Sequence, residues 1–186
     1  MTVLIILILF LVLALIVMSV YNRLVRLRNT RENAFADIDV QLKQRHDLIP
    51  QLVETVKGYM KHESDTLIKV TNARAAAMSA QGIGEKIAAE NQLSSALSGL
   101  KVSLEAYPDL KASANFLQLQ EEMADVENKL ASVRRYFNTT TKEYNNAVET
   151  FPANMIAGIF NFRRETMFDL GDERANLVKA PEVNFS

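Results

Sequence analysis

The sequence predicts an all-α protein whose N-terminal membrane-spanning helix continues into long amphipathic helices. Three observations support this fold class. Residues 1–22 carry no charged side chain, the remainder repeats hydrophobic residues at alternating spacings of four and three, and the 186 residues include only 6 Gly and 4 Pro. Glycine and proline are the residues least favourable inside a helix, so their scarcity favours long helices.

Composition also excludes several classes of protein. The chain has no Cys, which removes disulfide bonds, thiol nucleophiles and cysteine-ligated zinc or iron–sulfur sites. Its 21 Lys and Arg are matched by 22 Asp and Glu, whereas a general nucleic-acid binder carries a basic excess. We therefore expect no nucleic-acid partner.

The first predicted element is a membrane anchor. Residues 3–18 form an unbroken apolar run, which Val20 extends past Ser19. Eighteen helical residues rise about 27 Å, close to the roughly 30 Å hydrocarbon core of a bilayer. A buried soluble helix is disfavoured because few such helices are apolar on every face for so many turns. A cleaved signal peptide is disfavoured because no basic residue precedes the run and no small-x-small cleavage site follows it. We expect an uncleaved single-pass anchor whose lipid-facing residues include Val3, Leu7, Phe10, Ala14 and Met18.

Basic residues after the apolar run predict its direction. Only Met1 and Thr2 precede the run, whereas it is followed directly by Arg23, Arg26, Arg28 and Arg31. The positive-inside rule therefore places residues 21–186 in the cytoplasm and the N-terminus outside. Some of these arginines are also candidates for contacts within the helices that follow.

The longest predicted soluble helix covers residues 112–151. Its four-three seam consists of Ala112, Phe116, Leu119, Met123, Val126, Leu130, Val133, Phe137, Thr140, Tyr144, Ala147 and Phe151. All of these except Thr140 are hydrophobic, so a narrow apolar stripe faces other helices with coiled-coil-like packing. Pro152 ends the helix because the residue before a proline is pushed out of helical space.

Shorter repeats predict the other helices. One is carried by Leu93, Leu97, Leu100, Leu104 and Tyr107, and Pro108 interrupts it. Two further faces flank Pro50: Leu24, Leu27, Ala34, Phe35, Ile38 and Leu42 before it, and Ile49, Leu52, Val53, Val56, Met60, Leu67 and Val70 after it. Residues 81–84 form the clearest loop.

Two architectures fit these helices, depending on Pro50 and Pro108. If both prolines end helices, four helices near 21–48, 50–80, 85–106 and 109–150 form an up-and-down bundle. If both prolines only kink them, segments 21–80 and 85–150 form one long helical hairpin.

Polar residues on these helices indicate contacts between helices. Candidates for ion pairs around Pro50 are Arg45, Asp47, Glu54 and Lys57. Asparagine is a weak helix former, so some of the helical asparagines are expected to set helix register or subunit pairing. They are Asn22, Asn29, Asn33, Asn115, Asn128, Asn138, Asn145 and Asn146. Off the long seam lie Glu121, Glu122, Asp125 and Glu127, as expected of a solvated charged face.

The sequence lacks the motifs that are typical of metal-binding and catalytic sites. Di-iron bundles use Glu-x-x-His pairs, but Lys43 and Tyr59 stand three residues before His46 and His62. Both histidines are therefore expected to be surface or capping residues. No Gly-x-Ser-x-Gly elbow or glycine-rich phosphate loop occurs. We expect no catalytic, cofactor-binding or metal-binding residues, no cofactor and no small-molecule substrate.

The segment after Pro152 is unusually apolar. Its candidate contact residues are Met155, Ile156, Ile159, Phe160, Phe162, Met167 and Phe168, followed by Leu170, with Arg163 and Arg164 between them. One interpretation is a short helix that closes the end of the bundle. The other is an amphipathic segment that lies on a membrane or docks a neighbouring subunit.

Distinctive motifs run from the anchor to the C-terminus. They are NRLVRLR (22–28), IDVQLKQRHDLIP (38–50), LVETVKGY (52–59), YPDLKA (107–112), Asn115-Phe116, LQEE (119–122), Glu127-Asn128, Arg134-Arg135, Tyr144-Asn145, Phe151-Pro152 and PEVNF (181–185). On these motifs the chain resembles the LemA family. The resemblance implies an N-terminally anchored bacterial membrane protein with a four-helix up-and-down bundle, and it implies no known chemistry. We therefore expect an anchor at 1–20, a four-helix bundle at 21–151 and an amphipathic segment with a tail at 152–186, located in the inner membrane.

These features together predict a structural function. We expect a non-enzymatic protein that self-assembles into a homo-oligomer on the lipid bilayer, as a structural or membrane-shaping scaffold. A magnetosome membrane protein is similar to LemA, which suggests membrane remodelling by analogy. The alternative is a membrane-tethered adaptor that presents its bundle to another membrane protein, such as a protease, a sensor or an envelope-stress partner.

Overall fold

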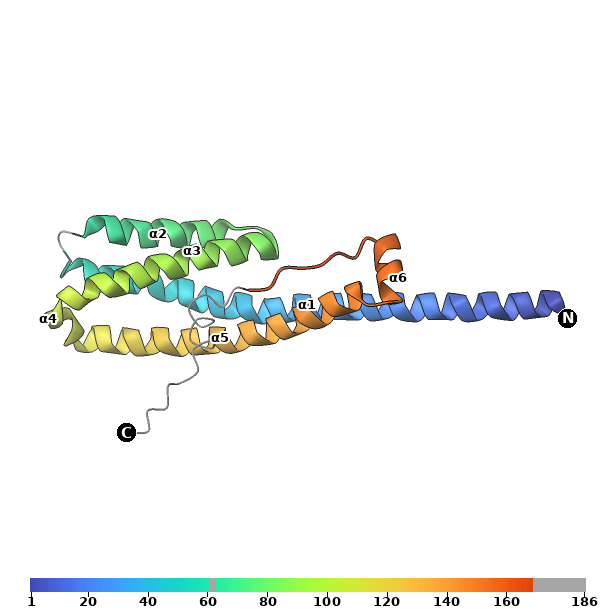
Figure 1. Ribbon diagram of the computed structural model, residues 1–186. Helices are drawn as coiled ribbons and strands as arrows, with labels where there is room; N and C mark the ends of the chain where they lie inside the picture. Colours follow the sequence, from blue (N-terminus) through green and yellow to red (C-terminus); the bar gives the residue numbers. More distant parts are fainter. Residues whose placement is uncertain (61–62, 169–186) are drawn as a thin grey trace, which may run out of the picture. The chain divides into compact units, whose positions relative to one another are not determined.

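The structure, a computed structural model, describes residues 1–60 and 63–168. Every regular element in these residues is helical, which confirms the predicted all-α class (Figure 1). The elements are α1 (Thr2–Lys57), α2 (Ser64–Ser79), α3 (Gly82–Ser103), the short 3-10 helix η1 (Leu104–Ala106), α4 (Pro108–Lys111), α5 (Ala114–Glu149) and α6 (Ala153–Ile159).

The first helix runs through Pro50, so this proline does not end a helix near residues 48 and 50, which decides for Pro50 between the two possibilities that the sequence left open. α1 continues to Lys57, after which Gly58 begins the turn toward α2. Proline has no N–H, and the carbonyl oxygen of His46, four residues earlier, therefore loses its helical partner. Arg74 of α2 replaces that partner, because its Nε donates a hydrogen bond to the His46 oxygen over 2.7 Å. A tertiary contact thus compensates for the proline.

Pro108, in contrast, separates two helices. η1 ends at Ala106, and Tyr107 takes φ −120° and ψ 77° before Pro108 opens α4. This conformation follows from the restriction that a proline places on the residue before it. The Tyr107 hydroxyl donates a hydrogen bond to Glu63, next to the start of α2, and this bond raises the pKa of Tyr107.

The four-three seam predicted for α5 is confirmed along the helix. Its buried members are Phe116, Leu119, Val126, Leu130, Phe137, Thr140, Tyr144 and Ala147. Met123 and Val133 are half-buried, whereas Ala112 and Phe151 are exposed because they lie beyond the two ends of the helix.

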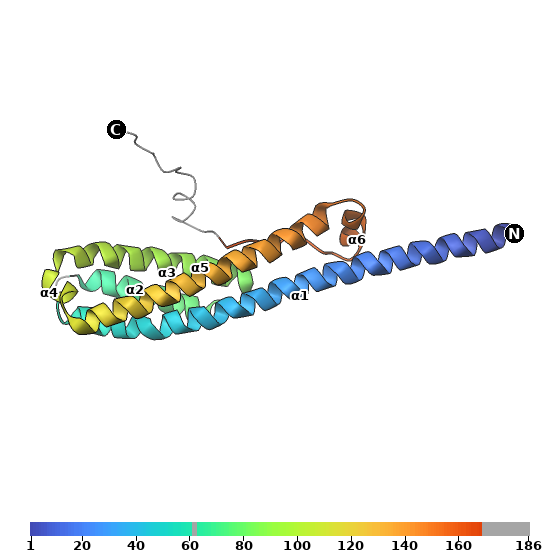
Figure 2. The same ribbon diagram turned by 90° about the horizontal axis from the view of Figure 1, so that it is seen from below.

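The described chain forms two compact units that share α1 and α5. Unit 1 comprises residues 1–42 and 128–167, and unit 2 comprises residues 43–127 together with Phe168. In unit 2, α2 and α3 lie side by side along the end of α1 and the beginning of α5 (Figures 1 and 2). The core of unit 2 takes side chains from each of these helices, including Ile49, Val56, Val70, Leu93, Leu100, Leu110 and Phe116.

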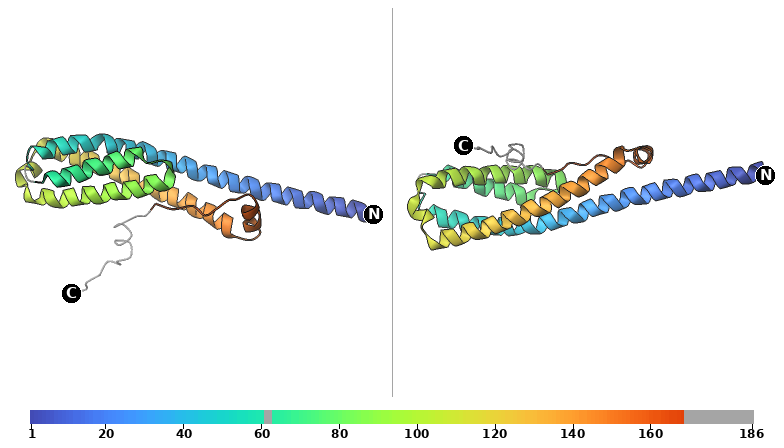
Figure 3. Two further views of the ribbon diagram at one scale, coloured as in Figure 1. Left: turned by 90° about the horizontal axis from the view of Figure 1, so that it is seen from above. Right: turned by 60° about the horizontal axis from the view of Figure 1, so that its bottom comes forward.

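Unit 1 joins the remaining part of α1 to the second half of α5, and α6 closes its end (Figure 3). Its core contains Leu24, Tyr144, Ala147, Val148, Ala157 and Phe162. The rings of Phe35 and Phe137 pack 5.4 Å apart, centre to centre. The predicted α1 face is buried at Leu24, Ala34, Phe35, Ile38 and Leu42. α6 therefore takes part in the core of unit 1, beside the helix that begins with the apolar run.

Candidate functional site

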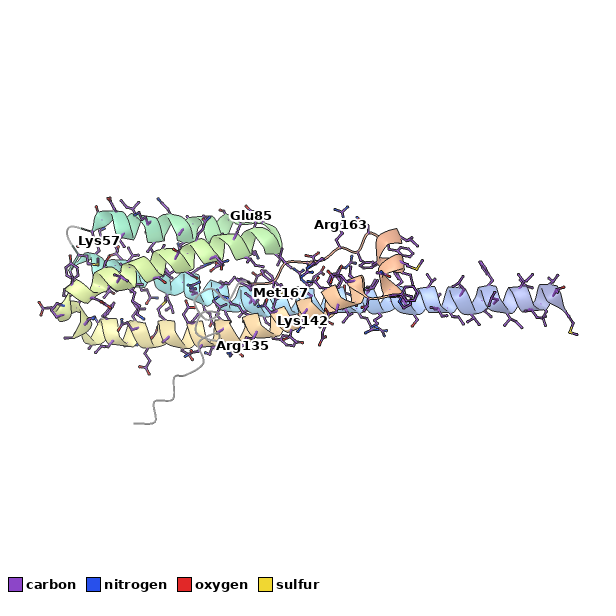
Figure 4. The ribbon with its side chains drawn as sticks, in the orientation of Figure 1. Lys57, Glu85, Arg135, Lys142, Arg163 and Met167 are labelled. Atoms are coloured by element: carbon purple, nitrogen blue, oxygen red, sulfur yellow. The ribbon has the colours of Figure 1, made fainter. Side chains whose placement is uncertain are left out.

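The apolar run predicted as an anchor forms the start of α1. One window of this helix is long and apolar enough to cross a membrane, and none of it is buried against the described chain. The predicted lipid-facing residues Val3, Leu7, Phe10, Ala14 and Met18 are all exposed. In Figure 4, side chains project from the first part of α1 without any other helix along most of its length. An apolar surface of this extent requires a membrane or an apolar partner to cover it.

The segment around α6 is apolar on two faces. Ile156 and Ala157 are buried on the core of unit 1, whereas Met155 and Ile159 are 62% and 77% exposed. Asn154 is the one polar residue in the helix. We define the apolar platform as the four outward residues Phe151, Met155, Ile159 and Phe160, all of them exposed. The segment thus closes the core of unit 1 and also leaves an apolar face uncovered.

The seven candidate contact residues divide between the two faces. Ile156, Phe162 and Phe168 are buried, whereas Met155, Ile159, Phe160 and Met167 are exposed. Leu170 and the PEVNF motif lie outside the described residues, as does His62. In the sequence these residues form one apolar group, and the packing of the folded chain divides them into buried and exposed members.

Aromatic rings join the platform to the end of the apolar run. The Tyr21 ring lies 4.7 Å from the ring of Phe160 and 5.7 Å from that of Phe162, centre to centre. The guanidinium carbon of Arg28 lies 5.3 Å from the centre of the Phe162 ring, a cation–π distance. Tyrosine is enriched where a helix leaves the hydrocarbon core of a membrane. The platform therefore lies beside the residue at which α1 changes from apolar to charged.

An open groove of about 480 Å³ runs along the apolar run and ends at the platform. Its lining comes from Phe10, Leu13, Ala14, Val17, Met18 and Tyr21 of α1 and from Phe160 after α6. The hydroxyl of Tyr21 is the one polar side-chain group among these residues.

The four membrane-flanking arginines have different surroundings. Arg23, Arg26 and Arg28 are exposed, whereas Arg31 is 3% exposed inside unit 1. Arg31 pairs with Glu165 over 3.2 Å and stacks on the Phe137 ring. Burial lowers the pKa of Arg31, and the Glu165 carboxylate opposes that shift. Three of the four cations therefore remain available to a membrane surface.

Asn145 holds the segment after α6 against α5. Its side-chain amide donates to the Glu165 carbonyl oxygen over 2.9 Å and accepts from the Glu165 N–H over 2.8 Å. A single side chain thus satisfies both backbone groups of one residue. This helical asparagine fixes the path of a neighbouring segment, within the same chain.

Unit 2 contains a buried polar layer around Glu90 of α3. Glu90 is 1% exposed, and its two carboxylate oxygens accept from Arg45 Nη1 over 3.1 Å and face His46 Nε2 over 2.6 Å. Arg45 also donates to Ser94 Oγ over 3.0 Å, and its Nε lies 2.7 Å from Glu127 of α5. Within residues 1–60 and 63–168, no three side chains of the His, Asp or Glu types gather closely enough to hold a metal ion. The layer links three helices, and the expectation that His46 is a surface or capping residue is wrong.

The four-three spacing of the sequence indicates that these charged residues are buried. The four-three spacing on α1 runs through Leu24, Arg28, Arg31, Phe35, Ile38, Leu42, Arg45, Ile49, Leu52 and Val56. Glu90 likewise stands three residues before Leu93, at the next seam position of its helix. Opposite charges on the seams of two helices predict a buried ion pair. Reasoning from hydrophobic positions alone missed it, although it did single out Arg45 as an ion-pair candidate.

Comparison with known proteins now decides the family. The sequence model of the LemA family matches residues 34–185. The chain belongs to the LemA family. A protein named LemA from Metamycoplasma hominis is 30% identical over 137 residues, which cover 73% of this chain and 63% of that relative. The magnetosome protein MamQ from Magnetospirillum gryphiswaldense is 21% identical over 174 residues, which cover 80% of this chain and 64% of that relative. The chain thus spans less than two thirds of either relative.

The LemA motifs coincide with the structural features just described. The motif at 38–50 supplies Arg45, His46 and Pro50, which are the centre of the polar layer and the proline that Arg74 compensates. Tyr144-Asn145 supplies a core aromatic ring and the residue that holds the segment after α6. Some motif residues of this LemA family chain therefore make contacts between different segments of the fold.

Proposed function

We propose that this protein is a membrane-anchored helical scaffold, in which α1 crosses the bilayer and the apolar platform lies in the interface beside it. The observation that carries the proposal is the contact between the rings of Phe160 and Tyr21, at the end of the membrane-length apolar run. Amphipathic segments lie with their apolar face about 5–10 Å into the headgroup boundary. The platform offers such a face at the level where the anchor leaves the hydrocarbon core.

Burial of the platform in lipid supplies a second attachment. Full burial of a Phe, Ile or Met side chain is worth about 1.5–3 kcal/mol. Several such side chains inserted at one leaflet act as a wedge beside the anchor, and the exposed Arg23 and Arg26 add attraction to anionic lipid. A wedge in one leaflet favours curvature, which is how a scaffold of this type shapes a membrane.

The complete proposal includes assembly and topology. Each copy of the chain has an anchor at residues 1–20, a four-helix up-and-down bundle at residues 21–151 and an amphipathic segment at residues 152–186. Copies associate side by side through their bundles. Residues 21–186 lie in the cytoplasm, at the inner membrane of a bacterial cell. The similarity to a magnetosome protein supports a membrane-shaping role over the adaptor alternative.

Insertion of the platform is testable by fluorescence. The chain has no Trp, so Ile159→Trp introduces a single reporter on the platform. We expect brominated lipids in reconstituted vesicles to quench this Trp strongly. Leu117→Trp, at an exposed site of α5 in unit 2, is the matched control and should be quenched little. Equal weak quenching of both reporters would show that the platform does not enter the membrane.

Assembly is tested separately by electron microscopy of full-length protein in mild detergent and in liposomes. We expect rings, stacks or reshaped vesicles, and we expect the double variant Met155→Ser/Ile159→Ser to lose them while keeping its helicity. The control is Ile68→Ser/Met78→Ser, which removes two exposed apolar residues of α2. Single small particles on unaltered vesicles would instead favour the adaptor.

A further inference from the structure

The groove along the anchor is larger than a packing defect. Its volume of about 480 Å³ falls within the range of roughly 300–1,000 Å³ that is usual for sites of small ligands. Ala14 is the smallest of its lining side chains and stands between the larger Phe10 and Val17. Phe160 borders the groove from a different segment of the chain, so the site depends on the fold and is more than a surface of one helix.

The lining indicates a hydrocarbon chain as the occupant. Helices that associate in membranes do so through small residues that let their backbones approach closely. Here Ala14 is the one small lining residue, and a second helix is about 10–12 Å wide with its side chains. Phe10, Met18 and Phe160 therefore hold such a helix away, whereas a single acyl chain fits between them.

One cation, Arg28, stands on the side of the groove where the headgroup of that lipid would lie. Arg28 follows Tyr21 by seven residues, or two helical turns, and so lies on the same face of α1 as the groove. Helical side chains lean toward the helix N-terminus, which points the Arg28 side chain back toward the groove. In the described part of the chain, no ion pair engages Arg28, whose guanidinium lies 5.3 Å from the centre of the Phe162 ring.

We propose that this groove binds one acyl chain of a phospholipid with an anionic headgroup, whose phosphate is held by Arg28. The binding rests on the part of the proposed function in which α1 crosses a bilayer. It adds that one lipid is retained as part of the folded protein, between the anchor and Phe160, and that its headgroup charge is selected. The lipid thereby ties the segment after α6 to the anchor.

Native mass spectrometry of the full-length chain tests the proposal. The protein is reconstituted into vesicles of phosphatidylglycerol and phosphatidylcholine and then extracted in mild detergent. We expect one retained phosphatidylglycerol per chain, enriched over its share of the vesicles. Arg28→Gln should weaken retention about tenfold, as expected for loss of a charge-assisted hydrogen bond. Ala14→Phe, which fills the groove, should weaken retention of both lipids.

Matched controls distinguish the site from general lipid affinity. Val12→Phe introduces the same aromatic side chain on the opposite face of α1, and Arg26→Gln removes an exposed cation from another face. Both controls should retain lipid as the wild type does. Equal lipid retention by all four variants would overturn the proposal. So would an Ala14→Phe variant that changes the number of associated subunits but retains as much lipid as the wild type. If the Trp on the platform is still quenched by brominated lipid in that case, the scaffold stands and the lipid site alone fails.

Discussion

At the scale of single residues, buried charge is the main departure from an ordinary helical bundle. Arg45 and Glu90 are almost fully buried in unit 2, and removing two such charges from water costs several kcal/mol for each ion. That cost is offset because both oxygens of Glu90 are engaged and the Arg45 guanidinium reaches partners on two other helices. A polar layer of this kind disfavours any shift of one helix against another, since a shift would leave buried charges unpaired.

Glu90→Ala should therefore destabilise the protein strongly. The change leaves Arg45 and His46 facing each other without the carboxylate, and breaking a buried pair in this way costs about 3–5 kcal/mol. Denaturant unfolding of the full-length protein in detergent, followed by circular dichroism, measures the loss. Glu121→Ala, at an exposed position off the α5 seam, should change stability by less than about 0.5 kcal/mol. Similar unfolding midpoints for the two variants would contradict this account of the layer.

At the scale of elements, α1 shows how a local rule yields to a tertiary contact. A proline inside a helix normally removes one hydrogen bond and favours a break or a kink. The sequence therefore left a helix end at Pro50 as one of two possibilities, but the helix continues to Lys57. Arg74 of α2 satisfies the carbonyl oxygen that the proline leaves without a partner. No pattern within residues 38–57 predicts this, because the compensating donor comes from another helix.

A double-mutant cycle tests the compensation. In the wild type, Arg74→Ala leaves the His46 carbonyl oxygen unpaired, at a cost of about 1–3 kcal/mol. With Pro50→Ala, residue 50 regains an N–H that bonds to the same oxygen, so Arg74→Ala should cost less. The expected coupling energy is about 1–2 kcal/mol, measured by denaturant unfolding of the four proteins. The control is Lys69→Ala, at an exposed site of α2, whose effect on the free energy of unfolding should be the same with Pro or Ala at position 50. A coupling energy near zero between Arg74 and Pro50 would contradict the explanation.

At the scale of the whole molecule, the proposed function depends on which side of the membrane holds the helices. Because the chain has no Cys, single cysteines report topology without interference. In intact cells, a membrane-impermeant maleimide should label Thr2→Cys, and it should label Ser98→Cys, at an exposed site of α3, only after permeabilisation. The reverse pattern would place residues 21–186 outside the cytoplasm and would show that the arginines after α1 do not set its direction.

The sequence by itself determined the helical class, the long apolar N-terminal helix and the α5 seam. These features repeat along one element, so neighbouring residues suffice to reveal them. The tertiary structure decided the rest: that Pro50 lies inside a helix, that Arg31, Arg45 and Glu90 are buried with partners, and that α6 has an inner and an outer apolar face. Each of these depends on residues far apart in the chain, such as Arg74 on His46 or Phe160 on Tyr21. Hydrophobic periodicity along one helix predicts which face of that helix is buried. Only the tertiary structure determines which residues of other helices contact that face.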